Sequence, residues 1–340
     1  MTSSNSLTNK REHLFRRLAL LTVITIYLVI IAGGIVRSTG SGMGCPDWPR
    51  CFGRWIPPTE ASQLPSNYQQ IYGAKLKGEI EFNAAKTWIE YINRLVGAFS
   101  GLLVFALLIT SVSYLKNDKR VFYGSLLSFI LIGLNGWLGS RVVAAELAPY
   151  LVTLHMLLAI LVVFSLLYVM TVSYTGHAEV EQIAGKKSLV TGILLITMVL
   201  SVIQVLIGTQ VREAIDEVIQ RMGYSERHRW IDSLDYRFYV HRSFSLIILA
   251  FHLAVIYQLR KFSKGKGLLA NLTNVLVVLV VVEILSGVVL AYFAVPAVAQ
   301  PIHLTLAIVI LGVQFTTLML LNADRISKNQ EAHLPHYSKV

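Results

Sequence analysis

The chain has 340 residues, of which 54% are hydrophobic and only 14% are charged, and its mean hydropathy is +0.60. A soluble domain of this length carries about a quarter of charged residues, so the composition excludes an ordinary soluble fold. The net charge of +11 does not indicate nucleic-acid binding, because the basic residues gather at the ends of apolar segments.

Eight apolar runs follow one another along the chain, each about 20 residues long, which is enough to span the hydrocarbon core of a bilayer. They cover residues 18–36, 90–114, 121–140, 150–173, 188–209, 238–259, 268–291 and 302–322. Helices are expected because lipid offers backbone groups no hydrogen-bond partner. The predicted fold class is therefore an all-α membrane protein with eight transmembrane helices.

Basic pairs mark one side of the predicted membrane domain. They include Lys10-Arg11, Arg16-Arg17, Lys119-Arg120, Lys186-Lys187 and Arg260-Lys261. The positive-inside rule then predicts that both termini are cytoplasmic. The first run is too long for a cleavable signal and lacks its cleavage site. We therefore predict a multi-pass protein of the cell inner membrane, surrounded by lipid and without a nucleic-acid partner.

The first outer loop holds the only two cysteines, Cys45 and Cys51, in the stretch GCPDWPRC. An outer loop faces an oxidising compartment, where a disulfide is sterically possible even in so short a ring. Two interpretations stay open, a structural staple and an exposed, redox-active pair. A zinc site is disfavoured because the loop offers no further cysteine or histidine.

Landmarks at one fixed offset indicate an internal repeat. Three pairs are 148 residues apart: Asn93 and His241, Gly139 and Gly287, and His155 and His303. A looser echo relates the stretch GIVR, which ends at Arg37, to TQVR, which ends at Arg212. We therefore predict two pseudo-symmetric four-helix bundles, formed by residues 1–174 and 175–340.

The repeat places Asn93, His155, His241 and His303 at a similar depth, near the outer ends of their helices. Polar side chains in a membrane usually face the bundle interior. Zinc would need three or four ligands, whereas two imidazoles across a bundle suit a six-coordinate haem iron. We predict that His241 and His303 hold a permanent bis-histidine haem in the second half, and that His252, three turns deeper, is a hydrogen-bonded core residue.

The first half differs in chemistry, because Glu90 lies where the second half has Phe238. Glu90 and Asn93 share one helix face, since they are i and i+3. The first half thus offers a carboxyl group and one histidine, whereas the second half offers two histidines and no carboxyl group. We assign the chemistry to the first half, where Glu90 holds or relays protons. The alternative is a carboxylate paired with Arg94 or Arg37.

Arg94 and Arg242 directly follow the landmark positions on their helices. A guanidinium near the outer surface can bind a haem propionate, or can simply snorkel to the interface. The outer segment 212–235 has two interpretations as well. Its amphipathic spacing suits an interfacial lid, and its alternative is an ordinary structured loop.

Together these stretches resemble the haem A synthase family. The resemblance covers nearly the whole chain and rests on GGIVRSTGSGMGCPDWPRCFG, IEY with the following NR, LVTLH, YVHR and PIHLTLA. It implies an oxidoreductase that oxidises the C8 methyl group of haem O to a formyl group, giving haem A for terminal oxidases. Haem O would arrive from the lipid or from its farnesyltransferase, and the electron donor is unknown.

The resemblance also implies roles for individual residues. Glu90 matches the catalytic glutamate, His155 matches a ligand of the substrate haem, and His241 and His303 match the ligands of haem b. Cys45 and Cys51 match a cysteine pair thought to assist catalysis or haem handling.

Asn93 departs from the family pattern, which has a histidine at this position. Either His155 alone holds the substrate haem, which leaves an oxygen site open, or activity is lost. We favour the first, because Glu90, Arg94, His155 and both cysteines are present. Two other functions are an electron-transferring bis-histidine cytochrome b and a non-catalytic haem-binding factor for oxidase assembly.

Overall fold

The computed structural model describes residues 2–73, 81–175, 187–263 and 267–323. Within these residues, eight helices are long and apolar enough to cross a membrane. They are α1 (Thr2–Ser38), α3 (Ala84–Ser111), α4 (Lys119–Ala144), α5 (Pro149–Thr175), α6 (Lys187–Met222), α7 (Tyr236–Ser263), α8 (Gly267–Tyr292) and α9 (Ala299–Leu321). The prediction of an all-α, multi-pass membrane protein is confirmed.

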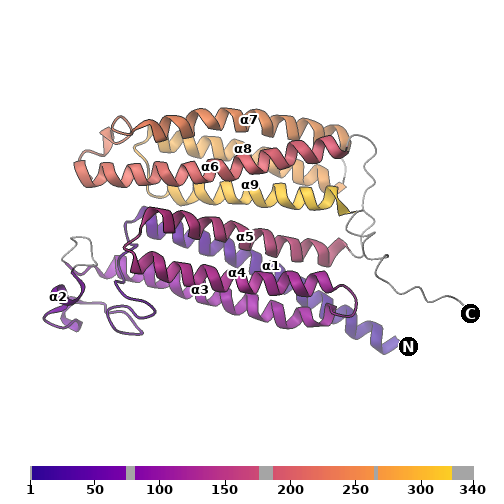
Figure 1. Cartoon of the computed structure of the whole chain (residues 1–340), viewed down its shortest axis with the longest axis horizontal. Helices are drawn as coiled ribbons and strands as arrows, with labels where there is room; N and C mark the ends of the chain where they lie inside the picture. The colour runs from indigo at the N-terminus through magenta and orange to yellow at the C-terminus, as the bar shows by residue number, and fades with distance from the viewer. Residues whose placement is uncertain (1, 74–80, 176–186, 264–266, 324–340) are drawn as a thin grey trace, which may run out of the picture.

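Four short helices complete the described structure: η1 (Ala61–Gln63), α2 (Tyr68–Tyr72), η2 (Val112–Tyr114) and η3 (Arg227–Arg229). Two of them, η1 and α2, belong to the long segment between α1 and α3. This segment and the shorter one between α6 and α7 lie at the same end of the molecule (Figure 1), which we call the loop end.

The spanning helices form two groups that lie side by side (Figure 1). In the first group, α1 packs on α3, α3 on α4, α4 on α5, and α5 closes the ring on α1. In the second group the ring order is α6, α7, α8 and α9, again closed on its first member. Helices α3 and α5, and likewise α7 and α9, therefore stand diagonally across their rings. This order agrees with the predicted repeat, which stays a prediction.

The contact between the two groups is made chiefly by α1 and α5 against α9. Phe164 of α5 stacks on Phe315 of α9 with ring centroids 4.7 Å apart. Near the loop end, Thr153 and Thr209 share a hydrogen bond of 3.0 Å between their hydroxyl groups, which joins α5 to α6.

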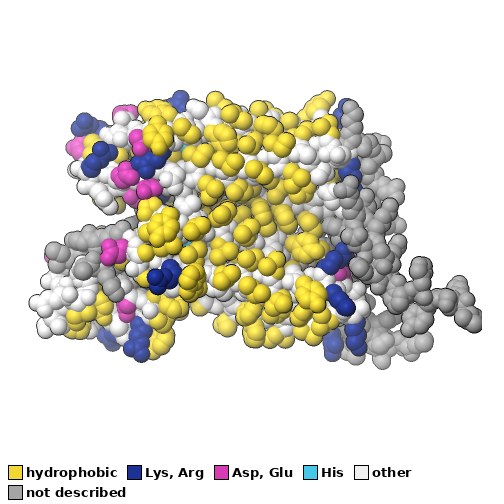
Figure 2. All heavy atoms as spheres, in the orientation of Figure 1, with side chains coloured by type: hydrophobic (Ala, Val, Ile, Leu, Met, Phe, Trp, Pro, Cys, Tyr) yellow, Lys and Arg dark blue, Asp and Glu magenta, His cyan; other side chains and the backbone are white. Residues whose placement is uncertain are grey.

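A broad apolar surface covers the middle of the molecule, and the charged side chains gather toward its two ends (Figure 2). Large apolar side chains on several helices are exposed, such as Leu102 at 66%, Leu246 at 67% and Val278 at 61%. An exposed apolar belt of this kind is what lipid tails would cover. Helix α1 begins and α9 ends at the end opposite the loop end (Figure 1).

Helix α6 is longer than the sequence predicted, because it continues past Thr209 to Met222. Val218 on this extension is buried and packs in one cluster with Trp230 and Leu234 of the following loop. The segment from Arg212 onward is therefore part of a packed, structured region. Of the two interpretations of residues 212–235, the ordinary structured loop agrees with this packing, because the apolar spacing that suggested an interfacial lid serves contacts within the protein.

Candidate active site and haem-ligand positions

A disulfide between Cys45 and Cys51 closes a short ring near the start of the loop after α1, as the sequence allowed. Both cysteines are fully buried, at 0% exposure. The redox-active interpretation required an exposed bond, and this premise is wrong for the folded chain. The disulfide lies against the first turns of α3, where Cys45 Sγ is 3.7 Å from the carbonyl oxygen of Thr87.

The loop can lie so close to α3 because Gly44 has no side chain. A Cβ atom at this position would be 2.5 Å from the carbonyl oxygen of Lys86 and 2.8 Å from the backbone nitrogen of Thr87. The Thr87 hydroxyl donates a 2.9 Å hydrogen bond to the Gly44 carbonyl oxygen. Backbone contact and side-chain hydrogen bond together fix the loop on the helix.

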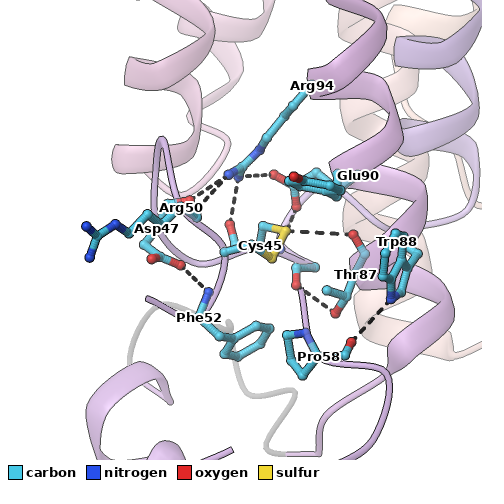
Figure 3. Close-up of a disulfide and its surroundings, with 12 residues drawn as sticks. Cys45, Asp47, Arg50, Phe52, Pro58, Thr87, Trp88, Glu90 and Arg94 are labelled. Atoms are coloured by element: carbon cyan, nitrogen blue, oxygen red, sulfur yellow. Dashed lines mark hydrogen bonds and ion pairs between the residues drawn. A yellow bond between two sulfur atoms is a disulfide. The ribbon is translucent and has the colours of Figure 1, made fainter. Parts of the chain in front are cut away.

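Glu90 lies under this loop with only 3% of its surface exposed (Figure 3). Its Oε2 accepts a 2.7 Å hydrogen bond from the backbone N–H of Cys45. Its Oε1 forms an ion pair with the Arg94 guanidinium, one turn along α3. The ion pair with Arg94 that the sequence left open is therefore present, while Arg37 pairs with Asp216 instead.

Arg94 also binds the backbone of the disulfide loop (Figure 3). Its guanidinium donates to the carbonyl oxygens of Asp47 at 2.6 Å, Arg50 at 3.0 Å and Cys45 at 2.9 Å. Sequence reasoning missed these contacts, because an irregular loop gives no pattern from which carbonyl positions can be predicted. One side chain thus joins the buried carboxyl group to three points of the loop.

Two buried polar atoms of the first bundle belong to the candidate site residues Asn93 and His155. Asn93 lies one turn after Glu90 on α3, and His155 lies on the diagonal helix α5. Asn93 Oδ1 and His155 Nδ1 are both buried, and neither makes a hydrogen bond of ordinary geometry within the described residues. Buried polar atoms without partners are uncommon and call for a ligand or water. Both atoms belong to residues that the sequence analysis singled out as candidate site residues of the first bundle.

The second bundle brings His241 of α7 and His303 of α9 together across its diagonal. Their ring centroids are 6.4 Å apart and the ring planes are inclined by 75°. Two metal–imidazole bonds of about 2 Å, with the ring centres roughly 1 Å beyond each nitrogen, give a separation of about 6 Å. The two imidazoles could therefore hold the iron of one haem between α7 and α9.

Glu283 of α8 is a carboxyl group that sequence reasoning missed, and the expectation of a second half without one is wrong. Its Oε1 lies 3.2 Å from His303 Nδ1. The Ser286 hydroxyl lies 2.8 Å from the same nitrogen. A signal was available, because Glu283 is the only charged residue within α8, and acids inside a membrane helix are usually functional.

Each landmark position also faces a glycine on a neighbouring helix. If each glycine carried a Cβ atom, that atom would lie close to the side chain at the landmark position. The distances would be 3.9 Å from Gly33 to Asn93 Oδ1 and 3.2 Å from Gly139 to His155 Cε1. They would be 3.2 Å from Gly208 to His241 Cε1 and 3.3 Å from Gly287 to His303 Cε1. The absent side chains leave room for the imidazole rings. Sequence reasoning missed Gly33 and Gly208, although these glycines directly precede the matched stretches GIVR and TQVR.

Arg242 is exposed near the loop end of α7, one residue after His241. It lines a pocket of about 450 Å³ together with Tyr239 and with Tyr292 at the end of α8. Further residues of the pocket are His228, Ile231, Asp232, Phe238, Ala291, Phe293 and Ala294. A guanidinium beside this opening is compatible with the predicted binding of a propionate.

His252 is a buried core residue, as the sequence predicted. Its Nδ1 lies 2.9 Å from the Ile248 carbonyl oxygen, and its Nε2 lies 2.9 Å from Gln314 Nε2. The imidazole therefore donates through Nδ1 and accepts through Nε2. This pair crosses from α7 to α9, three turns from the His241–His303 pair on the same two helices.

The fold and these sites define a multi-pass helical membrane protein with a pair of facing histidines and a buried, paired glutamate. A family model matches residues 16–315, and the chain belongs to the cytochrome oxidase assembly protein family.

Several relatives in this family are named heme A synthase. The protein from Shewanella oneidensis is 31% identical over 137 residues, covering 40% of this chain and 39% of its own length. The protein from Exiguobacterium is 27% identical over 259 residues, covering 73% of this chain and 75% of its own. The protein from Shouchella clausii is 30% identical over 141 residues, covering 41% of this chain and 39% of its own. The chain thus aligns with less than half of two of these relatives and with three quarters of the third.

Proposed function

We propose that the chain is a haem A synthase, an integral-membrane oxidoreductase that converts haem O to haem A for terminal oxidases. Family membership supports this function, as do the relatives that carry the same name. The single observation that carries the proposal is Glu90, a carboxyl group kept at 3% exposure beside Asn93 in the bundle that also holds His155.

The first bundle is the proposed site of the substrate haem. His155 would hold its iron, and Asn93 would border the opposite side without acting as a strong ligand. Glu90 would hold or move the proton that the oxidation of the methyl group requires, at its two carboxyl oxygens. Those oxygens are already fixed by Cys45 N–H and by Arg94, so the carboxyl group needs no rearrangement to act.

The second bundle is the proposed site of a resident haem b, held by His241 and His303. A haem iron with two imidazole ligands has no open position, so the group supplies electron transfer. The 6.4 Å separation of the two rings supports this role. Arg242 would bind a propionate at the pocket beside it, whereas Arg94 would act mainly through Glu90 and the loop.

In the membrane, we propose that the loop end faces the outside of the inner membrane and that both termini are cytoplasmic. The basic pairs at the opposite ends of the helices support this orientation. Residues 1–174 would then form the substrate half and residues 175–340 the cofactor half. Haem O synthase is the proposed source of the substrate, and the donor of the electrons is left open.

The test is to express the chain in a host that makes haem O but no haem A. The haems of the purified protein are extracted with acid and identified by chromatography and mass. Haem A, or its hydroxylated precursor, together with haem b is the expected result. Haem b alone, with haem O left untouched in the membranes, would refute the synthase proposal.

One observation favours a second candidate, a bis-histidine cytochrome b that only transfers electrons. Asn93 stands where the resemblance implies a histidine, so the first bundle has a single imidazole at these positions. This candidate predicts tightly bound haem b and no change of haem O. A third candidate, a non-catalytic factor for oxidase assembly, predicts that oxidase maturation stays intact after Glu90→Ala.

A further inference from the structure

The two histidines of the second bundle differ in what their Nδ1 atoms contact. His241 Nδ1 is buried and makes no hydrogen bond of ordinary geometry to any residue that the structure describes. His303 Nδ1 faces two oxygens of α8, Ser286 Oγ at 2.8 Å and Glu283 Oε1 at 3.2 Å. Among the described residues, His241 thus has only a backbone partner, Gln204, whereas His303 Nδ1 faces a hydroxyl group and a carboxyl group.

The hydrogen bonds around Ser286 favour one tautomer of His303. The Ser286 hydroxyl donates a 2.7 Å hydrogen bond to the backbone carbonyl oxygen of Glu283. Its oxygen is then free to accept, and a carboxylate oxygen of Glu283 can only accept, so this arrangement favours the tautomer with the proton on His303 Nδ1. The other nitrogen, Nε2, is left with its lone pair, which is the form that binds a metal.

The corresponding positions of the first bundle lack this arrangement. At the repeat offset of 148 residues, Asn135 corresponds to Glu283 and Leu138 to Ser286. The amide oxygen of Asn135 is buried and makes no hydrogen bond within the described residues. His155 has the backbone of Asn135 as its polar partner in place of a carboxyl group. The carboxyl group and the hydroxyl group thus belong to the second bundle alone.

We propose that Glu283 and Ser286 are positioning residues for His303, which fix its tautomer and ring orientation and strengthen it as an iron ligand. This inference rests on the proposed resident haem of the second bundle. A carboxylate that accepts from a ligand imidazole raises the basicity of that ligand. A more basic ligand stabilises the ferric state, so the pair would hold the reduction potential of this haem low and favour electron transfer toward the first bundle.

The test uses full-length protein purified with its haem and three variants, Glu283→Gln, Ser286→Ala and Glu213→Gln. Glu213 lies on α6 in the same bundle, where its carboxylate is 3.9 Å from the Arg237 guanidinium. It therefore controls for the loss of one negative charge. The measurements are optical redox titration of the six-coordinate haem, its ferric electron paramagnetic resonance spectrum, and the rate of haem transfer to apomyoglobin.

Glu283→Gln is expected to raise the reduction potential, to shift the ferric spectrum and to speed haem transfer by roughly 10–100-fold. Ser286→Ala should change all three in the same direction and by less, and it keeps the test informative if Glu283→Gln folds poorly. Glu213→Gln should match the unaltered protein. Equal potentials, spectra and transfer rates in Glu283→Gln, Ser286→Ala and Glu213→Gln would overturn this inference but would leave the proposed resident haem standing. Purified protein without a six-coordinate haem would instead overturn the proposed function of this bundle.

Discussion

The backbone N–H of Cys45 donates a 2.7 Å hydrogen bond to Glu90 Oε2, so the disulfide loop directly holds the carboxyl group proposed for catalysis. Arg94 binds the other carboxyl oxygen and three loop carbonyls, which makes loop and carboxyl group one unit. Changes to the loop should therefore reach the chemistry of the first bundle and spare the haem of the second.

Replacing Glu90 by Gln should abolish most of the oxidation of haem O while preserving the fold. Glutamine keeps an oxygen that can accept from Cys45 N–H, but it cannot hold and release the proton. General acid–base groups contribute typically 10²–10⁴-fold, so haem A formation should fall by about that factor. The ratio of haem A to haem O in extracts measures it, and full turnover would remove Glu90 from the mechanism.

Replacing Arg94 by Ala should loosen the loop, because a buried carboxyl group and three carbonyl oxygens lose their donor. Breaking a buried ion pair costs about 3–5 kcal/mol. We expect a lower melting temperature of the purified protein and faster proteolysis within residues 39–73. Arg50→Ala is the matched control, since the Arg50 side chain is exposed on the same loop. Equal protease resistance of the two variants would contradict the proposed clamp.

The disulfide should resist reduction in the folded protein, because both cysteines are fully buried. We expect no maleimide labelling of Cys45 or Cys51 after treatment of native protein with a mild thiol reductant, and complete labelling after denaturation. Rapid labelling of the native protein would instead support a redox-active pair and a loop that opens.

Replacing Asn93 by His should give the first bundle a second imidazole across from His155. The space beside Gly33 favours this change, since Asn93 Oδ1 is still 3.9 Å from a Cβ added there. The bound haem O should then show a six-coordinate, low-spin spectrum in place of a five-coordinate one. An unchanged spectrum would mean that position 93 does not face the substrate iron.

The sequence was sufficient to predict the eight membrane helices and the landmarks on them, because hydropathy and the offset of 148 residues are properties of the chain itself. It placed His241 and His303 on facing helices correctly, and their close approach is now seen directly. The extension of α6 beyond Thr209 was missed, because hydropathy detects only the part of a helix that lies in lipid. The stretch that begins at Arg212 is polar, although it is still helical.

Contacts that depend on helix rotation or loop shape could not be predicted. Glu283 is separated from His303 by a turn between helices, and only the rotation of α8 brings its carboxyl group to that ring. Likewise, the three loop carbonyls around Arg94 have no sequence signature, because every residue has a carbonyl group.

The division of labour between the bundles is the central claim, and the haem content of two variants tests it most directly. His241→Ala and His155→Ala are purified from membranes that contain haem O, and their haems are identified by mass and by optical spectra. We predict that His241→Ala loses haem b, whereas His155→Ala keeps haem b and loses haem O and haem A. Loss of haem b from His155→Ala, with haem b kept in His241→Ala, would contradict the account.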